Sequence, residues 1–212
     1  MDFIFDPSLV LYLPLYGLDG ASFMSRDAYG RVCTVSGASW NPNGYYFDGT
    51  DDFINIGNAN LVLGSTPRTA LAWIKALDIS TEQAILQYGT TTTRKLFRLY
   101  IQSELLRLAT YSDDHSSDAS KIASNVWLLV GVTYDGSTGL TFYVNENKAG
   151  SGTLGGLLNT ALGYYEESIG GGGTDGTAIS FGGFIGSVFL YNRALTPQEI
   201  QHNYLTTKWR YQ

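Results

Sequence analysis

The chain has 212 residues, of which 44% are hydrophobic and 15% charged, so it can bury a core without a disulfide or a metal. Its net charge of −6 argues against a nucleic-acid partner, which needs a basic face, and Cys33 is its only cysteine. No run approaches the roughly 18 apolar residues of a membrane helix, and the N-terminus lacks the basic start of a signal peptide. We therefore expect neither nucleic-acid binding nor membrane insertion.

Short apolar runs separated by polar turns follow one another along the chain, which is typical of β-strands. Strands are expected at residues 9–16, 31–36, 45–47, 52–56, 69–76, 84–88, 97–111 (as two strands), 126–134, 140–144, 164–169 and 181–191, and a weaker strand pattern follows the turn at residues 145–147. Neither a linker nor a repeat of fixed period interrupts this pattern. We therefore expect residues 1–212 to form a single all-β domain, a sandwich of two antiparallel sheets.

Two local signals are especially clear. Residues 135–139 contain an Asp-Gly pair between two β-rich runs, which predicts an antiparallel hairpin. Thr196, Pro197 and Glu199 predict a short C-terminal helix over residues 197–207. Thr196 can cap this helix, Pro197 lacks an N–H where none is needed, and Glu199 completes a capping box.

Several motifs, in the same order along the chain, resemble the LamG-like jelly-roll domains of the concanavalin A-like lectin/glucanase superfamily. The matching segments are residues 12–15 with 27–30, 47–54 (Phe-Asp-Gly-Thr-Asp-Asp-Phe-Ile), 71–75 (Leu-Ala-Trp-Ile-Lys), 127–136 with 142–145, and 191–200 (from Tyr-Asn-Arg-Ala-Leu-Thr). The resemblance implies a jelly-roll β-sandwich that binds more often than it catalyses. One departure is that residues 186–188 read Gly-Ser-Val, where the family usually has an acidic pair.

The resemblance also implies structural Ca²⁺ as an option, because members of the family often carry it. Asp27, Asp48, Asp51 and Asp52 lie in loops that the resemblance places near each other, and loop oxygens are the ligands that Ca²⁺ prefers. We take Asp27 and Asp51 as the candidate metal ligands. The alternative is that these aspartates only build turns, and no cofactor is expected to be required.

The chain lacks the acidic pattern of the glucanases in this superfamily. Those enzymes carry Glu-x-Asp-x-x-Glu on one strand, which points the carboxylates to one face. Glu166 and Glu167 are adjacent instead, so on a strand their side chains would point to opposite faces. Residues 113–118 contain Asp, His and Ser, but crowded into one polar loop that we expect to be solvated. We therefore expect no enzyme and no catalytic residues.

Aromatic residues next to polar loops are the candidate ligand-binding residues. Trp40, Tyr45 and Tyr46 border such loops and could stack on sugar rings, whereas Trp73 and Trp127 lie inside apolar strands and are expected in the core. The favoured function is a non-catalytic, lectin-like module that recognises glycans or a surface partner through its end loops.

The alternative is a structural or adhesive phage or virus surface protein, such as a capsid decoration or tail protein, without a sugar site. A chain that begins at Met1 without a leader favours this alternative, because virion proteins are made in the cytoplasm. The sequence leaves the localisation unknown, and a virion or extracellular surface is compatible with both interpretations.

Overall fold

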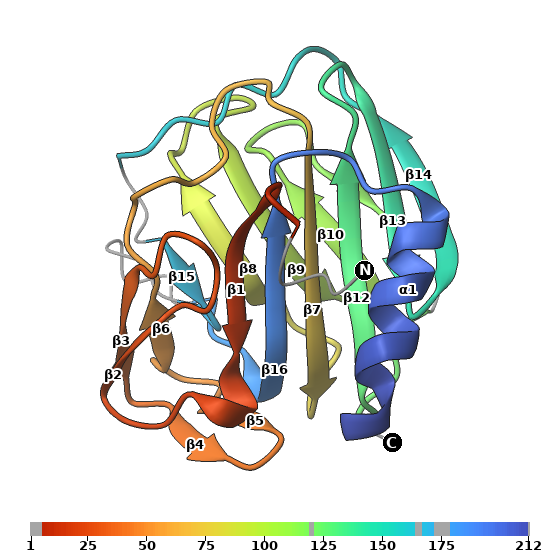
Figure 1. Ribbon diagram of the computed structural model, residues 1–212. Coiled ribbons are helices and arrows are strands. Elements are labelled where there is room, and N and C mark those ends of the chain that lie inside the picture. The colour runs from red at the N-terminus through yellow and green to blue at the C-terminus, as the bar shows by residue number, and fades with distance from the viewer. Residues whose placement is uncertain (1–5, 119–120, 164–166, 172–178, 212) are drawn as a thin grey trace.

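The computed structural model describes residues 6–118, 121–163, 167–171 and 179–211. They form two antiparallel β-sheets that pack face to face, with a helix at the C-terminal end lying against the outside of one sheet (Figure 1). This architecture confirms the predicted all-β jelly-roll sandwich with one short C-terminal helix. Among the described residues, no helix is long and apolar enough to cross a membrane.

Each sheet contains eight strands. In the first sheet, the strands are, in spatial order, β14 (Asn147–Thr153), β13 (Gly139–Val144), β12 (Leu128–Tyr134), β7 (Arg68–Ala76), β16 (Gly182–Tyr191), β5 (Gly44–Asp48) and β4 (Ser39–Asn41), with β1 (Leu9–Pro14) also paired to β16. In the second sheet, they are β11 (His115–Ser116), β10 (Leu105–Ala109), β9 (Leu96–Gln102), β8 (Gln83–Gly89), β15 (Ser168–Ile169), β6 (Phe53–Asn55), β3 (Val32–Ser36) and β2 (Ser22–Met24). The helical segments are η2 (Leu15–Gly17), α1 (Pro197–Thr207) and η3 (Lys208–Arg210).

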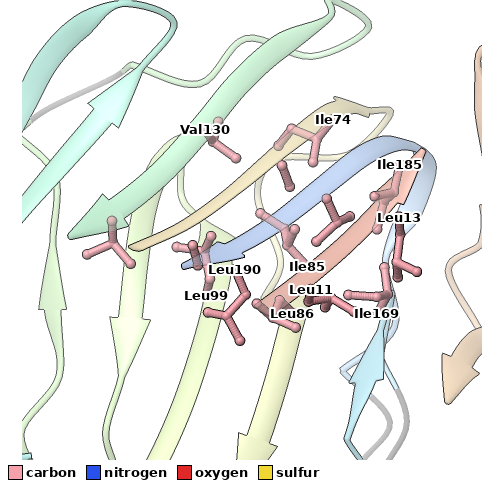
Figure 2. Packing of buried hydrophobic residues seen from close by; sticks show 14 of the residues in the cluster. Leu11, Leu13, Ile74, Ile85, Leu86, Leu99, Val130, Ile169, Ile185 and Leu190 are labelled. Atoms are coloured by element: carbon pink, nitrogen blue, oxygen red, sulfur yellow. The ribbon is translucent and has the colours of Figure 1, made fainter. Parts of the chain in front are cut away.

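Inward-pointing side chains of both sheets form the main hydrophobic core between them. Figure 2 shows part of this core, with side chains from the two sheets meeting in one layer. The labelled residues are Leu11, Leu13, Ile74, Ile85, Leu86, Leu99, Val130, Ile169, Ile185 and Leu190.

Strand β7 is apolar on both faces because both faces are covered. Ala72 and Ile74 point into the main core, whereas Leu71 and Trp73 belong to a second cluster under the helix. Trp73 is only 1% exposed and its indole N–H donates a hydrogen bond to Thr207 Oγ1 at 2.8 Å. The helix therefore turns the outer face of the first sheet into a second, smaller core.

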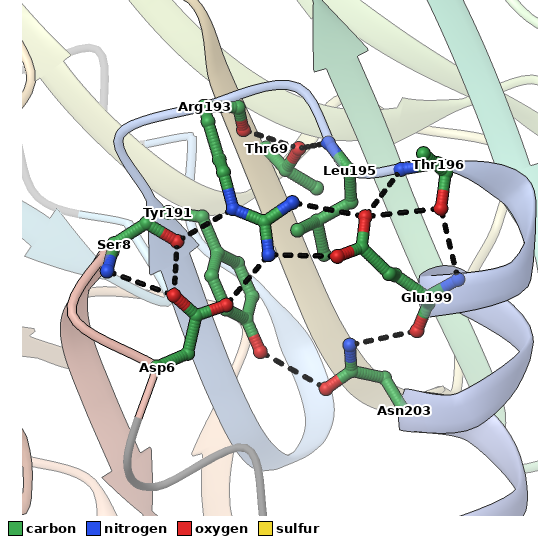
Figure 3. A network of polar contacts seen from close by, with 9 residues as sticks. All are labelled: Asp6, Ser8, Thr69, Tyr191, Arg193, Leu195, Thr196, Glu199 and Asn203. Carbon is green, nitrogen blue, oxygen red and sulfur yellow. Dashed lines mark hydrogen bonds and ion pairs between the residues drawn. The ribbon is translucent and has the colours of Figure 1, made fainter. Parts of the chain in front are cut away.

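The helix begins as predicted. Thr196 Oγ1 accepts a hydrogen bond from Glu199 N, and the Glu199 carboxylate accepts one from Thr196 N, which completes the capping box. Arg193 ties this helix start to the N-terminal segment through Asp6 and Ser8 (Figure 3). Polar contacts therefore hold the N-terminal segment against the start of the C-terminal helix.

The unexpected Gly-Ser-Val sequence in the middle of β16 has a structural explanation. The pairing of β16 with β7 is irregular between Ile185 and Val188, and Tyr211 lies over the irregularity. The Tyr211 hydroxyl accepts a hydrogen bond from Ser187 N at 2.8 Å, and a Cβ at Gly186 would overlap the same hydroxyl. A tyrosine therefore fills the place where the resemblance implied acids.

Most predicted strands are present, with a few differences. Strands β2 and β4 were not predicted, and residues 164–166 of one predicted strand lie outside the described residues. Trp127 precedes β12 and is half-buried at the edge of the second cluster, with its ring tilted against Tyr211 at a centroid distance of 4.7 Å, so the expectation that it is fully in the core is wrong. The predicted solvated loop at 113–118 is also wrong, because His115–Ser116 pairs with β10 as strand β11.

Candidate functional site

A hollow opens where three loops of the sandwich meet, beside strands β4 and β5. Its volume is about 280 Å³. We call it the Trp40 hollow; its lining residues are Asp19, Gly20, Ala21, Val35, Gly37, Ala38, Trp40 and Tyr45. They come from the segment before β2, the turn between β3 and β4, and the β4–β5 hairpin, so several separate segments build one concave site.

Two of the three predicted ligand-binding residues line this hollow. Trp40 and Tyr45 are directly opposite each other in the β4–β5 pair, and Trp40 is 40% exposed. Tyr45 is only 1% exposed, and its hydroxyl donates a hydrogen bond to the Gly20 carbonyl at 3.0 Å. Burial raises the pKa of Tyr45 to about 12. The predicted exposure of Tyr45 is therefore wrong: its ring is a fixed wall, and Trp40 is the exposed aromatic surface.

The third predicted residue, Tyr46, lies elsewhere. Successive side chains of a strand point to opposite faces, so Tyr46 leaves the first sheet on the side away from Tyr45. It is half-buried there and packs against Phe184, with ring centroids 5.2 Å apart. Tyr46 is therefore not part of the Trp40 hollow.

The polar groups of the hollow are a carboxylate and exposed backbone. Asp19, Gly20 and Gly37 are all exposed, and none of them was singled out from the sequence. The negative charge of Asp19 contributes to the raised pKa of Tyr45, which places the carboxylate near the aromatic wall. An open aromatic face beside hydrogen-bond acceptors suits a ligand with an apolar ring face and hydroxyl groups.

A group of three carboxylates adjoins the hollow on the other side of Gly37. Asp48, Asp51 and Asp52 each place a carboxylate oxygen within 4.8 Å of the others. Gly37 has a φ of +75°, and a Cβ there would overlap Asp52 Oδ1, so only glycine allows this close approach. The hollow and the acidic group therefore share one turn of the chain.

The acidic group is held in place by its own turn. Asp52 Oδ2 accepts a hydrogen bond from Asp48 N at 2.8 Å, and Asp48 Oδ1 accepts one from Thr50 N at 2.7 Å. Burial raises the pKa of Asp52, and the negative charges of Asp48 and Asp51 raise it further. A divalent cation would relieve this repulsion, so the oxygen donors fit Ca²⁺ by charge, although three carboxylates supply only part of the six to eight ligands it takes.

Asp27 is not a member of this group. Its two carboxylate oxygens accept hydrogen bonds from Tyr12 N and Tyr29 N. In the described part of the chain, Asp51 is grouped with Asp48 and Asp52 instead. The predicted metal site that combined Asp27 with Asp51 is therefore not formed as expected.

The Asp-His-Ser segment forms a structural junction. Asp113 Oδ1 lies 3.2 Å from His115 Nε2, and Asp113 Oδ2 accepts a hydrogen bond from Gly155 N at 2.9 Å and faces Arg94 at 3.5 Å. Ser117 Oγ is engaged with Leu106 N at 3.1 Å. The carboxylate therefore ties loops together, and the serine oxygen accepts a backbone hydrogen bond.

The fold and the hollow together define a class of protein: a two-sheet jelly-roll domain with a concave site among its loops. A sequence model of the Concanavalin A-like lectin/glucanases superfamily matches residues 48–201. The chain belongs to this superfamily. A search of curated proteins found no match.

Solved structures with the same fold include parts of two toxins and of an enzyme. The binding domain of botulinum neurotoxin serotype D is 15% identical with a TM-score of 0.68, covering 94% of this chain and 52% of the toxin domain. The binding domain of Paraclostridial Mosquitocidal Protein 1 is 14% identical with a TM-score of 0.66 and the same coverage. A mutant of Trypanosoma rangeli sialidase displaying trans-sialidase activity is 18% identical with a TM-score of 0.70, covering 97% of this chain and 34% of the sialidase. The chain therefore spans about half of the toxin domains and a third of the sialidase, and at these identities the likeness shows the fold.

Proposed function

We propose that this protein is a non-catalytic, lectin-like binding module that recognises a glycan through the Trp40 hollow. The observation that carries the proposal is the exposed ring of Trp40, which forms one side of a 280 Å³ hollow beside the carboxylate of Asp19. The apolar face of a pyranose would stack on the indole, and its hydroxyls would donate to Asp19 and to backbone carbonyls. The receptor binding domains of botulinum neurotoxin D and of the C/D mosaic serotype share this fold, which agrees with a binding role here.

The absence of catalysis is part of the same proposal. Catalysis of glycoside hydrolysis needs two carboxylates about 5–9 Å apart on either side of the scissile bond. In the part of the chain that the structure describes, Asp48, Asp51 and Asp52 form one group of three carboxylates, two of which are engaged in their own turn. The carboxylates of Asp6 and Glu199 also lie close together, but both are paired with Arg193. Asp113 is engaged in loop contacts, and Glu166 lies outside the described residues.

A glycan array with the purified protein tests the proposal first. The best glycan is then titrated by calorimetry against the native protein and Trp40→Ala. We expect Trp40→Ala to weaken binding at least tenfold, about 1.4 kcal/mol, because it removes the stacking surface. Tyr29→Ala is the matched control, because it removes another exposed aromatic ring that does not line the hollow.

Three results would contradict the proposal or a part of it. One is an array with no bound glycan, which would favour the structural or adhesive alternative. Another is a glycan bound equally well by Trp40→Ala, which would move the site away from the hollow. Hydrolysis of the bound glycan during the titration would contradict the non-catalytic part of the proposal.

A further inference from the structure

A second hollow, of about 180 Å³, lies between the first helical turn and the C-terminal segment. Its lining residues are Tyr12, Tyr16, Ser187, Thr206, Thr207, Trp209, Arg210 and Tyr211. None of them lines the Trp40 hollow. We call it the Arg210 hollow.

The guanidinium of Arg210 lies between two aromatic rings in this hollow. Its central carbon is 3.7 Å from the ring centroid of Tyr16 and 4.6 Å from that of Trp209. Contact with both rings restricts the position of the guanidinium, while its N–H groups remain the polar part of the side chain that can donate hydrogen bonds. Arg210 is therefore preorganised as a hydrogen-bond donor.

Among the residues that the structure describes, no carboxylate forms an ion pair with Arg210, although the chain is acidic with a net charge of −6. Ion pairs among the described residues use the other cationic side chains Arg94, Arg98, His115 and Arg193. A planar guanidinium binds a carboxylate strongly, often through two parallel N–H···O bonds. The unpaired edge of Arg210 thus matches a carboxylate supplied by a ligand.

The neighbouring side chains match an apolar ring with hydroxyl groups. Trp209 is 67% exposed, the highest value among the large hydrophobic residues of the described chain. Its indole N–H donates to the Thr206 carbonyl at 3.0 Å, which fixes the ring without covering it. Tyr211 is 6% exposed and stacks on Trp73 at 4.5 Å, so it is a rigid part of the wall.

We propose that the Arg210 hollow binds a carboxylate-bearing pyranose, the acidic sugar unit of a glycan. The carboxylate pairs with the edge of Arg210 and the ring packs on the exposed face of Trp209. The hollow is smaller than the 300–1,000 Å³ of drug-sized pockets, which suits one sugar unit. A phosphate fits less well, because phosphate sites usually gather several N–H donors. The other cation nearby, Lys208, lies over the ring of Tyr204 instead.

Nuclear magnetic resonance of the indole N–H of Trp209, assigned with Trp209→Phe, tests this proposal. The protein is titrated with D-glucuronate, with D-glucose and with acetate, which separate the carboxylate from the sugar ring. We expect a saturable shift with D-glucuronate and at least tenfold weaker binding of the other two. This result does not depend on the Trp40 hollow, so either proposal can fail alone.

Arg210→Gln should weaken D-glucuronate binding at least tenfold, and Arg210→Lys should weaken it too, because lysine keeps the charge but not the planar fork. Lys148→Gln is the matched control, because it changes the net charge equally at an exposed position on β14 and should bind normally. Equal binding of D-glucose would overturn the role of the carboxylate. Equal binding of acetate would indicate a site for any carboxylate, such as an acidic protein side chain, and would also overturn the proposal. Unchanged binding of D-glucuronate by Arg210→Gln would overturn it as well.

Discussion

Arg193 and Glu199 form a two-pronged ion pair at the start of the C-terminal helix. Arg193 Nη1 donates to Glu199 Oε2 at 2.9 Å, and Arg193 Nη2 lies 2.8 Å from Glu199 Oε1 (Figure 3). The hydrogen bonds from Arg193 lower the pKa of Glu199 to about 2. The same arginine reaches Asp6, so this pair connects the helix to the other end of the described chain.

The first prediction concerns the pH dependence of this pair. Because the pKa of Glu199 is lowered from 4.5 to about 2 on folding, its stabilisation is present above pH 4.5 and is lost as the pH falls towards 2. Glu199→Gln keeps the helix cap but removes the charge. We expect melting midpoints about 1–3 °C lower for the variant at pH 6–7, since both side chains are partly exposed. The difference should vanish near pH 2; a difference that stays constant with pH would contradict the ion-pair assignment.

The second prediction compares two positions in the helix interface. Trp73→Ala should destabilise the fold by about 3–5 kcal/mol, because the ring is 1% exposed and stacks on Tyr204 and Tyr211. Thr196→Ala should cost about 1 kcal/mol, because it removes the cap acceptor and an exposed hydrogen bond from the hydroxyl to Glu199. Urea unfolding measures both free energies. Equal costs would show that the helix does not bury Trp73 as described.

The third prediction concerns the acidic group beside the Trp40 hollow, where we propose that Ca²⁺ binds. At 1 mM Ca²⁺ and a dissociation constant near 10 µM, binding would stabilise the fold by about 2.7 kcal/mol. The melting midpoint should then rise by about 5–10 °C over a sample in EDTA. Identical midpoints would leave these aspartates as turn residues in a metal-free domain.

Asp52→Asn provides an independent check on the same group. The pKa of the Asp52 carboxyl is raised in the fold, so its charged form is unfavourable and the protein loses stability as the pH rises through that pKa. In EDTA at pH 7, Asp52→Asn should therefore melt at a higher temperature than the native protein. It should also lose the response to Ca²⁺; a lower midpoint in EDTA would contradict the proposed repulsion.

Features set by neighbouring residues were predictable from the sequence. The helix start depends on Thr196, Pro197 and Glu199, which act within one turn, and it forms as predicted. The hairpin across residues 135–139 likewise depends on local turn chemistry, and β12 and β13 pair around it. Both rest on short-range contacts that the amino-acid sequence displays directly.

Features set by tertiary packing were not predictable in the same way. Arg68 is 0% exposed and donates to the carbonyls of Leu63 and Gly64 and to the hydroxyl of Tyr88, yet a lone arginine in a sequence gives no sign of burial. Tyr45 and Tyr46 are adjacent aromatics, and only the pairing of β5 decides which one faces inward.

In the candidate site, too, features set by neighbouring residues were predictable and features set by tertiary packing were not. Trp40 was identified because it borders a polar loop, whereas Asp19 lies 21 positions earlier and reaches the hollow through the fold. The candidate metal ligands follow the same division. Asp48, Asp51 and Asp52 meet within one turn, and the longer-range partnership with Asp27 did not form.

The central claim is that a glycan binds against Trp40. Its most direct test is the shift of the Trp40 indole N–H resonance, assigned with Trp40→Phe, during titration with the glycan selected by the array. The account predicts that this indole and the backbone amides of Gly20 and Gly37 shift together and saturate at one dissociation constant. A bound glycan that leaves these three resonances in place would contradict it.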